Sequence, residues 1–156
     1  MNEELDVLLE KDQIGEVVTR LFVRTDQRDW AGVRECFADR VLFDMTSLAG
    51  GEPALQTPAQ IASGWEQGLK PLAAVHHQMG NLLVHVHGQD ADAFCYATAS
   101  HWLPNPTGAN SRTFVGSYDF HLVELAGRWR IDRFRFNLKY IEGNKDLEAS
   151  AAGRAS

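Results

Sequence analysis

The apolar residues in the first half of the chain recur with the period of an α-helix. One stripe, at positions 14, 17, 18, 21 and 22, covers a single face of an amphipathic helix, for which Asp12 is a suitable N-cap. Asp29 can cap a second, short helix. A capping box that opens at Thr57 predicts a third helix, which we expect to end at Pro71.

The second half of the chain shows the pattern of β-strands instead. β-branched and aromatic residues recur there between short clusters of Gly, Asn, Asp and Pro. We expect four strands joined by turns, and a short strand between the helices, with the ranges 81–87, 93–103, 112–125, 128–140 and 41–45. This order predicts an α+β domain in which helices pack on one face of a curved, mainly antiparallel sheet. Such a domain encloses a cavity if the concave side chains do not fill it.

The last strand leaves two arrangements open. Arg133, Arg135 and Asn137 alternate with apolar residues, so that one of the two sets faces the core. If a β-bulge follows Ile131, the arginines point outward, whereas without a bulge they line the cavity together with Trp129. Periodicity alone does not choose between these arrangements.

Composition and charge narrow the class of protein. The chain has 156 residues, of which 44% are hydrophobic and 23% charged, as is usual for one globular domain, and this excludes disorder for the bulk of the chain. A net charge of −6 would repel polyanions, which argues against a protein that binds nucleic acid or an anionic membrane. No apolar run approaches the ~20 residues that a membrane-spanning helix needs.

The two cysteines and the chain ends indicate a compartment and a domain boundary. Cys36 and Cys95 lie in apolar stretches without a CxxC spacing, so we expect buried free thiols in a reducing environment. The N-terminal segment is acidic where a signal peptide would be basic. We therefore expect a cytoplasmic protein, with a domain over 1–142 and a flexible C-terminal tail over 143–156 that has almost nothing to bury.

Asp26 is the most informative polar position. The apolar stripe of the first helix, extended by one turn, falls on this residue. A carboxylate at the inward end of an apolar face is costly unless a partner binds it. Two interpretations follow. Either the helix ends at Arg24 or Thr25 and Asp26 caps the next turn, or Asp26 faces a pocket and holds a partner there.

The adjacent His76 and His77 are the obvious partners for Asp26. Neighbouring residues of a strand point to opposite faces of the sheet, so only one of the two can face inward. An Asp that accepts a hydrogen bond from one imidazole nitrogen fixes the tautomer and makes the other nitrogen more basic. The pattern therefore indicates a general base, although a structural or surface histidine pair would have the same sequence.

The remaining histidines are weaker candidates for a catalytic or metal-binding role. His85 and His87 form an HxH motif, which can place two metal ligands on one strand face. No Glu follows at the required spacing and no second histidine motif completes the set, so we expect both at a solvated strand end and no bound metal. His101 and His121 are isolated strand residues, for which we expect structural roles.

Three segments together carry a family resemblance. They are TDQRDWAGVRECFADRVLFD, HHQMGNLLVHVHGQDADAFCYATASHW and GRWRIDRFRFNLKY. Their order and spacing resemble the SnoaL-like branch of the NTF2-like superfamily over roughly residues 8–142. The resemblance implies a cone-shaped fold, in which N-terminal helices close the concave face of a strongly curved sheet over an apolar pocket.

Within that branch the chain looks most like the lyases, namely scytalone dehydratase, hexachlorocyclohexane dehydrochlorinase and bile-acid dehydratase. The resemblance implies a catalytic Asp–His dyad made by Asp26 and by His77, which Asn81 follows four residues later. We expect the substrate pocket to include Phe22, Trp65, His76, Tyr96, Arg135 and Asn137.

The residues and the resemblance together predict a small enzyme that uses no cofactor. It would abstract a proton from a small hydrophobic, cyclic substrate, with elimination favoured over isomerisation. The alternative is a non-catalytic small-molecule-binding or dimerisation module with the same fold. A distance between Asp26 and His77 beyond hydrogen-bond reach, or a cavity plugged by aromatic side chains, would favour that alternative. The resemblance also implies a homo-oligomer, either a dimer or a trimer.

Overall fold

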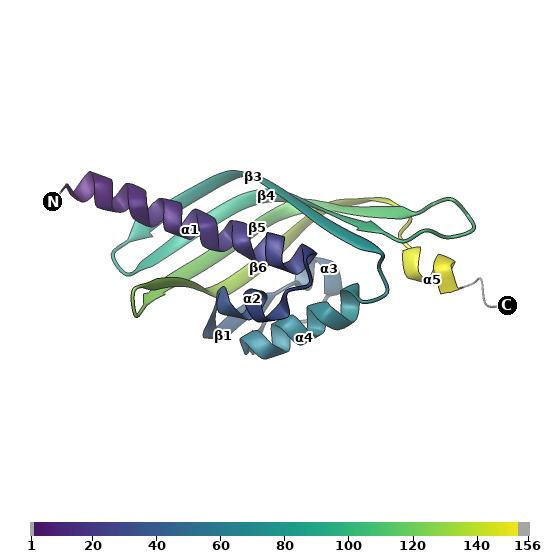
Figure 1. Cartoon of the computed structure of the whole chain (residues 1–156), viewed down its shortest axis with the longest axis horizontal. Helices are drawn as coiled ribbons and strands as arrows, with labels where there is room; N and C mark the ends of the chain where they lie inside the picture. The colour runs from purple at the N-terminus through teal and green to yellow at the C-terminus, as the bar shows by residue number, and fades with distance from the viewer. Residues whose placement is uncertain (1, 153–156) are drawn as a thin grey trace.

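The first helix is longer than the apolar stripe indicates. In the computed structural model, which describes residues 2–152, α1 spans Glu3–Asp26. Its N-cap is Asn2, whose side chain accepts a hydrogen bond from the Glu4 backbone N–H, so the helix does not begin at Asp12. The first turns project beyond the sheet (Figure 1), where no packing requires an apolar stripe. The stripe residues that are buried are Ile14, Val18, Leu21 and Phe22. No helix within residues 2–152 is long and apolar enough to cross a membrane.

Two further helices begin where their capping residues predicted. Asp29 is the N-cap of α2 (Trp30–Glu35) and accepts a hydrogen bond from the Gly32 N–H. Thr57 and Gln60 form the capping box that opens α4 (Pro58–Leu69). Both predictions are confirmed. The segment between these helices contains β1 (Phe37–Asp44), a single turn of helix, α3 (Thr46–Ala49), and β2 (Ala54–Gln56).

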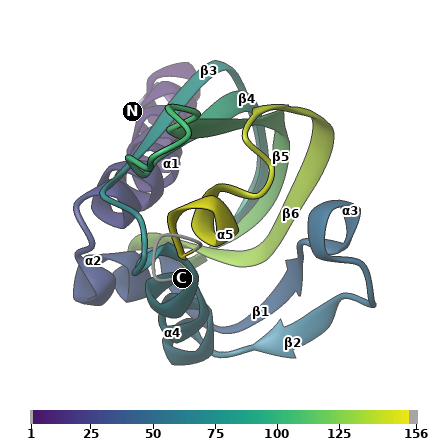
Figure 2. The ribbon, with the colours of Figure 1, turned by 90° about the vertical axis from the view of Figure 1, so that its right-hand side faces the viewer.

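Within the part of the chain that the structure describes, six strands form one strongly curved sheet. The four long strands are β3 (Ala74–His87), β4 (Asp90–Trp102), β5 (Ser111–Leu125) and β6 (Arg128–Gly143). The strand order is β2-β1-β6-β5-β4-β3, in which only the β1–β6 pairing is parallel. Figures 1 and 2 show α1, α2 and α4 across the concave side of this sheet. The predicted α+β class, with helices on a curved and mainly antiparallel sheet, is confirmed.

A β-bulge in β6 decides between the two arrangements of the last strand. Leu122 pairs with Ile131 and His121 with Arg133, so Asp132 is an extra residue on β6. Because the bulge adds one residue, the aromatic residues that follow it point into the core. The buried positions on β6 are therefore Trp129, Ile131, Phe134 and Phe136. The arginines at 133 and 135 are exposed on the convex face.

A second bulge sets the faces of β3. Gly80 pairs with Tyr96 and Leu83 with Phe94, which leaves one extra residue on β3. Asn81 adopts a positive φ of 56° at this point, a conformation that asparagine tolerates better than most residues. Beyond the bulge, the apolar residues Leu82, Val84 and Val86 pack on the core, whereas His85 and His87 are exposed.

The core lies between the helices and the concave face of the sheet. Its centre is an aromatic cluster in which the Tyr118 ring lies 5.0 Å from the Phe22 ring and 5.5 Å from the Phe134 ring, measured between centroids. Cys36 and Cys95 are free and buried in this core, as predicted. Burial raises the pKa of the Cys36 thiol to about 11 and that of Cys95 to about 12. Both thiols therefore stay protonated and act as apolar filling.

The C-terminal segment contributes to the core, contrary to the prediction that it has almost nothing to bury. Gly143 still belongs to β6, and residues Leu147–Ala152 form a short helix, α5. Leu147 is fully buried in a small cluster with Leu72 and Val75. Figure 2 shows α5 inside the mouth of the curved sheet. The part of the expected tail over 153–156 lies outside the described residues.

Candidate active site

The side chains of Asp26 and His77 are in direct contact. Asp26 is the last residue of α1, and its Oδ1 lies 2.6 Å from His77 Nδ1. Its Oδ2 accepts a hydrogen bond of 2.8 Å from the His77 backbone N–H. The carboxylate therefore fixes both the main chain and the ring of His77. Since a carboxylate only accepts hydrogen bonds, the neutral form of the His77 ring carries its proton on Nδ1 and leaves the lone pair of Nε2 free.

The ring of His77 is also held by its packing. The Phe22 ring stacks on it with a centroid distance of 5.4 Å and an interplanar angle of 27°. Only 12% of the His77 side chain and 17% of the Asp26 side chain are exposed. His76 points the other way, is exposed and contacts the Gln78 amide at 3.2 Å, as strand alternation requires.

A cavity of about 280 Å³ opens beside His77. Helix α1 contributes Phe22 to its wall, and α4 contributes Trp65, both of which were expected there. The segment around α3 contributes Met45 and Leu48, and the sheet contributes aromatic rings. The walls are mostly apolar, with a few polar groups that converge on the interior, which is the usual character of a small-molecule site.

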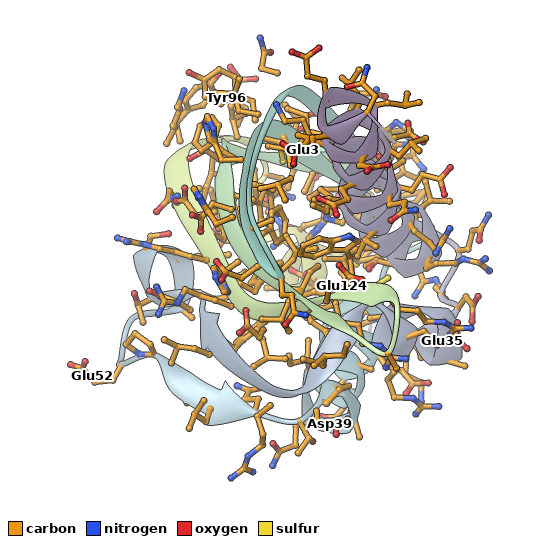
Figure 3. All side chains as sticks on the ribbon, turned by 90° about the vertical axis from the view of Figure 1, so that its left-hand side faces the viewer. Glu3, Glu35, Asp39, Glu52, Tyr96 and Glu124 are labelled. Atoms are coloured by element: carbon orange, nitrogen blue, oxygen red, sulfur yellow. The ribbon has the colours of Figure 1, made fainter. Side chains whose placement is uncertain are left out.

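Four residues expected in the pocket are absent from its wall. Besides His76, they are Tyr96, Arg135 and Asn137. Tyr96 lies on β4 between two inward-facing small residues, so its ring points outward, where Lys139 Nζ lies 4.1 Å from its centroid. Figure 3 shows Tyr96 outside the curve of the sheet.

The bulge at Asp132 accounts for the other two corrections on β6. Arg135 is 60% exposed, and its Nε lies 3.8 Å from Asp44 Oδ2 at the convex side of the sheet. Asn137 donates hydrogen bonds to Ser117 Oγ and Asp119 Oδ2 there. These residues had been assigned to the pocket because the face of the last strand was undetermined.

Two polar residues that were not assigned to the pocket do line it. Tyr118 on β5 is only 6% exposed, and its hydroxyl makes no hydrogen bond within residues 2–152. Burial raises its pKa well above the ordinary value, so the hydroxyl stays protonated and can donate. His101 on β4 is the second such residue.

Burial, with a smaller effect of the Arg112 charge, lowers the pKa of His101 to about 4. The ring is therefore neutral at physiological pH. A sequence signal for its direction exists, because the small residues at 91, 93, 95, 97 and 99 are all buried and His101 continues their alternation. That run of small residues marks the inward face of β4.

The histidines of the convex face stand apart from this cavity. His87 Nε2 lies 3.4 Å from Asp92 Oδ2, and more than half of each side chain is exposed. Over residues 2–152, no group of three or more His, Cys, Asp or Glu side chains is placed to hold a metal ion.

The comparisons with known proteins agree with the fold. A family model described as the SnoaL-like domain matches residues 6–135. The Kfla4162 protein from Kribbella flavida is similar in structure, with a TM-score of 0.85 and 22% identity over 92% of this chain and 99% of that chain. No curated protein matches the sequence significantly.

Two enzyme-related structures share the fold at lower identity. The type 3 hexachlorocyclohexane dehydrochlorinase from Novosphingobium barchaimii LL02 has a TM-score of 0.75 and 13% identity, over 92% of this chain and 95% of that chain. A scytalone dehydratase-like protein from Novosphingobium aromaticivorans has a TM-score of 0.74 and 14% identity, over 88% and 89% of the two chains. The family match spans most of the present sequence, and the chain therefore belongs to the SnoaL-like domain family.

Proposed function

We propose that this protein is a cofactor-independent lyase that eliminates a leaving group from a small, apolar, cyclic substrate. The observation that carries the proposal is the contact between Asp26 and His77 at the wall of an apolar cavity. The dehydrochlorinase and dehydratase-like proteins that share the fold support a lyase role at the level of the family. A distance of 2.6 Å and an open cavity argue against a purely structural binding module.

In the proposed reaction, His77 Nε2 takes a proton from a C–H bond of the substrate. The electron pair of that bond forms a double bond to the neighbouring carbon, from which the leaving group departs with its own bonding pair. A halide leaves as the anion, and the His77 imidazolium then releases its proton to water. A hydroxide takes the proton back from the His77 imidazolium and leaves as water, so that the enzyme returns to its starting state.

Asp26 would support both states of the base. It holds the Nδ1–H tautomer before proton transfer, and its negative charge stabilises the imidazolium afterwards. The Tyr118 hydroxyl and the neutral His101 ring could donate hydrogen bonds to a carbonyl oxygen or to the departing group. The apolar walls limit access of water to these charges.

The test is turnover by the purified protein of chlorinated cyclohexanes and of cyclic β-hydroxy ketones, with formation of the alkene followed by mass spectrometry. We expect turnover of at least one class, and we expect His77→Ala to abolish it while the melting temperature changes little. The matched control is His76→Ala, which removes the neighbouring exposed imidazole and should retain activity. Full turnover by His77→Ala would overturn the proposal.

A further inference from the structure

Arg112 lies behind the cavity wall and connects His101 to the C-terminal helix. Its side chain is 12% exposed, at the beginning of β5. One edge of its guanidinium donates hydrogen bonds to both carboxylate oxygens of Glu148 on α5, with distances of 2.9 Å from Nη1 and 2.5 Å from Nη2. Nη2 also lies 2.9 Å from His101 Nδ1, and the guanidinium lies 5.1 Å from the centroid of the Phe114 ring. Arg112 is thus held from three sides.

The contact with Arg112 determines where the proton of His101 resides. A guanidinium has only donors, so His101 Nδ1 must accept the hydrogen bond. The proton of the neutral ring is then on Nε2. His77 has the opposite arrangement, because its Nδ1 donates to a carboxylate. The same cavity therefore contains one imidazole with a free lone pair and one with a free N–H.

We propose that Arg112 is a positioning residue which, anchored by Glu148 of α5, holds His101 in the Nε2–H tautomer and so gives the cavity a fixed, uncharged hydrogen-bond donor. This inference rests on the proposed function only where it assigns the donor to the substrate, because the tautomer is a property of the free protein. The C-terminal helix α5 then contributes to the site, because its Glu148 holds Arg112 in place. The donor fits a substrate that carries a carbonyl oxygen, a hydroxyl group or a halogen.

The charges around His101 favour the same state. Arg112 and His77 oppose a positive charge on the ring, whereas Glu148 and Asp26 favour one, and burial adds the largest cost. Their sum lowers the pKa of His101 to about 4, so the ring donates without becoming a cation at neutral pH. A neutral donor can stabilise negative charge that develops on the substrate and keep its own proton on Nε2.

The interpretation that Arg112 merely fastens α5 makes a different prediction. The ion pair with Glu148 and the burial of Leu147 are sufficient for docking the helix, and neither requires a contact with the imidazole. A purely structural arginine would leave the tautomer and the titration of His101 unaffected when it is replaced. The two interpretations are therefore separable by a spectroscopic measurement.

The experiment is long-range ¹H–¹⁵N NMR of the protein labelled with ¹⁵N-histidine, with His101 assigned from the His101→Gln variant. In the wild type at pH 7, we expect the proton of His101 on Nε2 and that of His77 on Nδ1. In Arg112→Met, which preserves length but removes the donors, we expect a mixture of His101 tautomers and a titration midpoint raised by about one pH unit. Arg128→Met, which changes an exposed arginine of β6, is the matched control and should match the wild type.

Kinetics provide the second measurement. With a substrate identified as above, we expect Arg112→Met to lower kcat roughly tenfold with a smaller change in KM, and Arg112→Lys to recover part of the loss. A wild-type His101 with its proton on Nδ1, or His101 signals unchanged in Arg112→Met, would overturn the proposal. Failure of every substrate would count against the lyase function alone, because the tautomer of the wild-type protein is measured without turnover. That measurement also does not depend on whether a variant folds.

Discussion

His77 and His101 have the same side chain but hold their protons on opposite nitrogens. The difference comes from one neighbour each, since Asp26 can only accept a hydrogen bond and Arg112 can only donate one. At the scale of single residues, the chemistry of the cavity is therefore set by groups that stand behind the imidazoles. Substitutions of these groups should affect catalysis more than folding.

The first prediction concerns Asp26→Asn. The amide keeps the size of the carboxylate but removes the negative charge, so the His77 imidazolium loses its support. We expect kcat to fall by about 10²–10⁴-fold, the usual contribution of a general base. Asp12→Asn changes an exposed carboxylate on the same helix and should leave kcat unaltered. Steady-state kinetics check both, and full activity of Asp26→Asn would contradict the proposed role.

The second prediction concerns the Tyr118 hydroxyl, which has no hydrogen-bond partner within residues 2–152. Tyr118→Phe removes this polar group from a buried position without breaking a hydrogen bond of the free protein. We expect the free energy of unfolding to stay within about 1 kcal/mol or to rise, while kcat or ligand affinity decreases. Urea denaturation and kinetics measure the two effects. A large loss of stability would show that the hydroxyl is structural.

At the scale of elements, α4 contains two glycines that shape the cavity. Gly64 and Gly68 both line it, and a Cβ added at either position would contact nothing within 4 Å. Glycine inside a helix costs about 1 kcal/mol relative to alanine, so their presence needs another reason. Space at the mouth of the cavity is that reason, because alanine at either position would narrow it.

The third prediction follows for Gly64→Ala and Gly68→Ala. Each should raise the free energy of unfolding by about 0.5–1 kcal/mol and, at the same time, raise KM for the bulkier substrates. The control is Gly15→Ala in α1, whose new Cβ would lie 3.4 Å from Leu82 Cδ2, away from the cavity. It should change stability without changing KM. Unchanged KM in both α4 variants would contradict a role in substrate fit.

Elements specified by local chemistry could be predicted from the sequence. The N-cap at Asp29 and the capping box at Thr57 need only neighbouring residues, and both were placed correctly. Asp26 was found because the helical period carries the apolar stripe to it. The start of α1 was placed too late, because its projecting turns are specified by the cap at Asn2 and not by packing.

Features that depend on pairing between distant strands could not be predicted. The face of Arg135 is set by the register of β6 against β5, and no periodicity within β6 encodes that register. Tyr96 was misplaced for a related reason, because its direction follows from the small residues that flank it on β4. His101 and Tyr118 could have been found from the same alternation once the inward face was known.

At the scale of the whole molecule, His101 makes the free energy of unfolding depend on pH in the acid range. Its pKa is about 4 in the folded protein and near 6.5 in the unfolded chain. Between these values the unfolded chain binds more protons, so the free energy of unfolding rises with pH. The contribution of His101 to that free energy is lost as pH falls from 6.5 to 4. The contribution is on the order of 3 kcal/mol, because each unit corresponds to about 1.4 kcal/mol.

The fourth prediction tests this coupling by urea denaturation at pH 7, 5.5 and 4. His101→Asn should lose less stability than the wild type over this range, because it lacks the group that the unfolded chain protonates. His87→Asn, which removes an exposed histidine of the convex face, should follow the wild-type decline. Equal slopes for His101→Asn and the wild type would contradict the lowered pKa.

Because β6 contains one extra residue, the fold should respond differently to a deletion and to an insertion at that position. His121 Nδ1 lies 2.6 Å from the bulged Asp132 and pins it on the convex side. Deleting Asp132 would join Ile131 to Arg133 in regular alternation, so that Arg133 and Arg135 stay on the convex face and Phe134 stays in the core. We expect circular dichroism to show a folded protein for this deletion. One residue inserted after Asp132 would instead exceed what the bulge absorbs and turn Phe134 outward, and we expect no folded protein from it. The bulge should thus tolerate the loss of its extra residue far better than the gain of another, and homologous chains should lack a residue there more often than they add one.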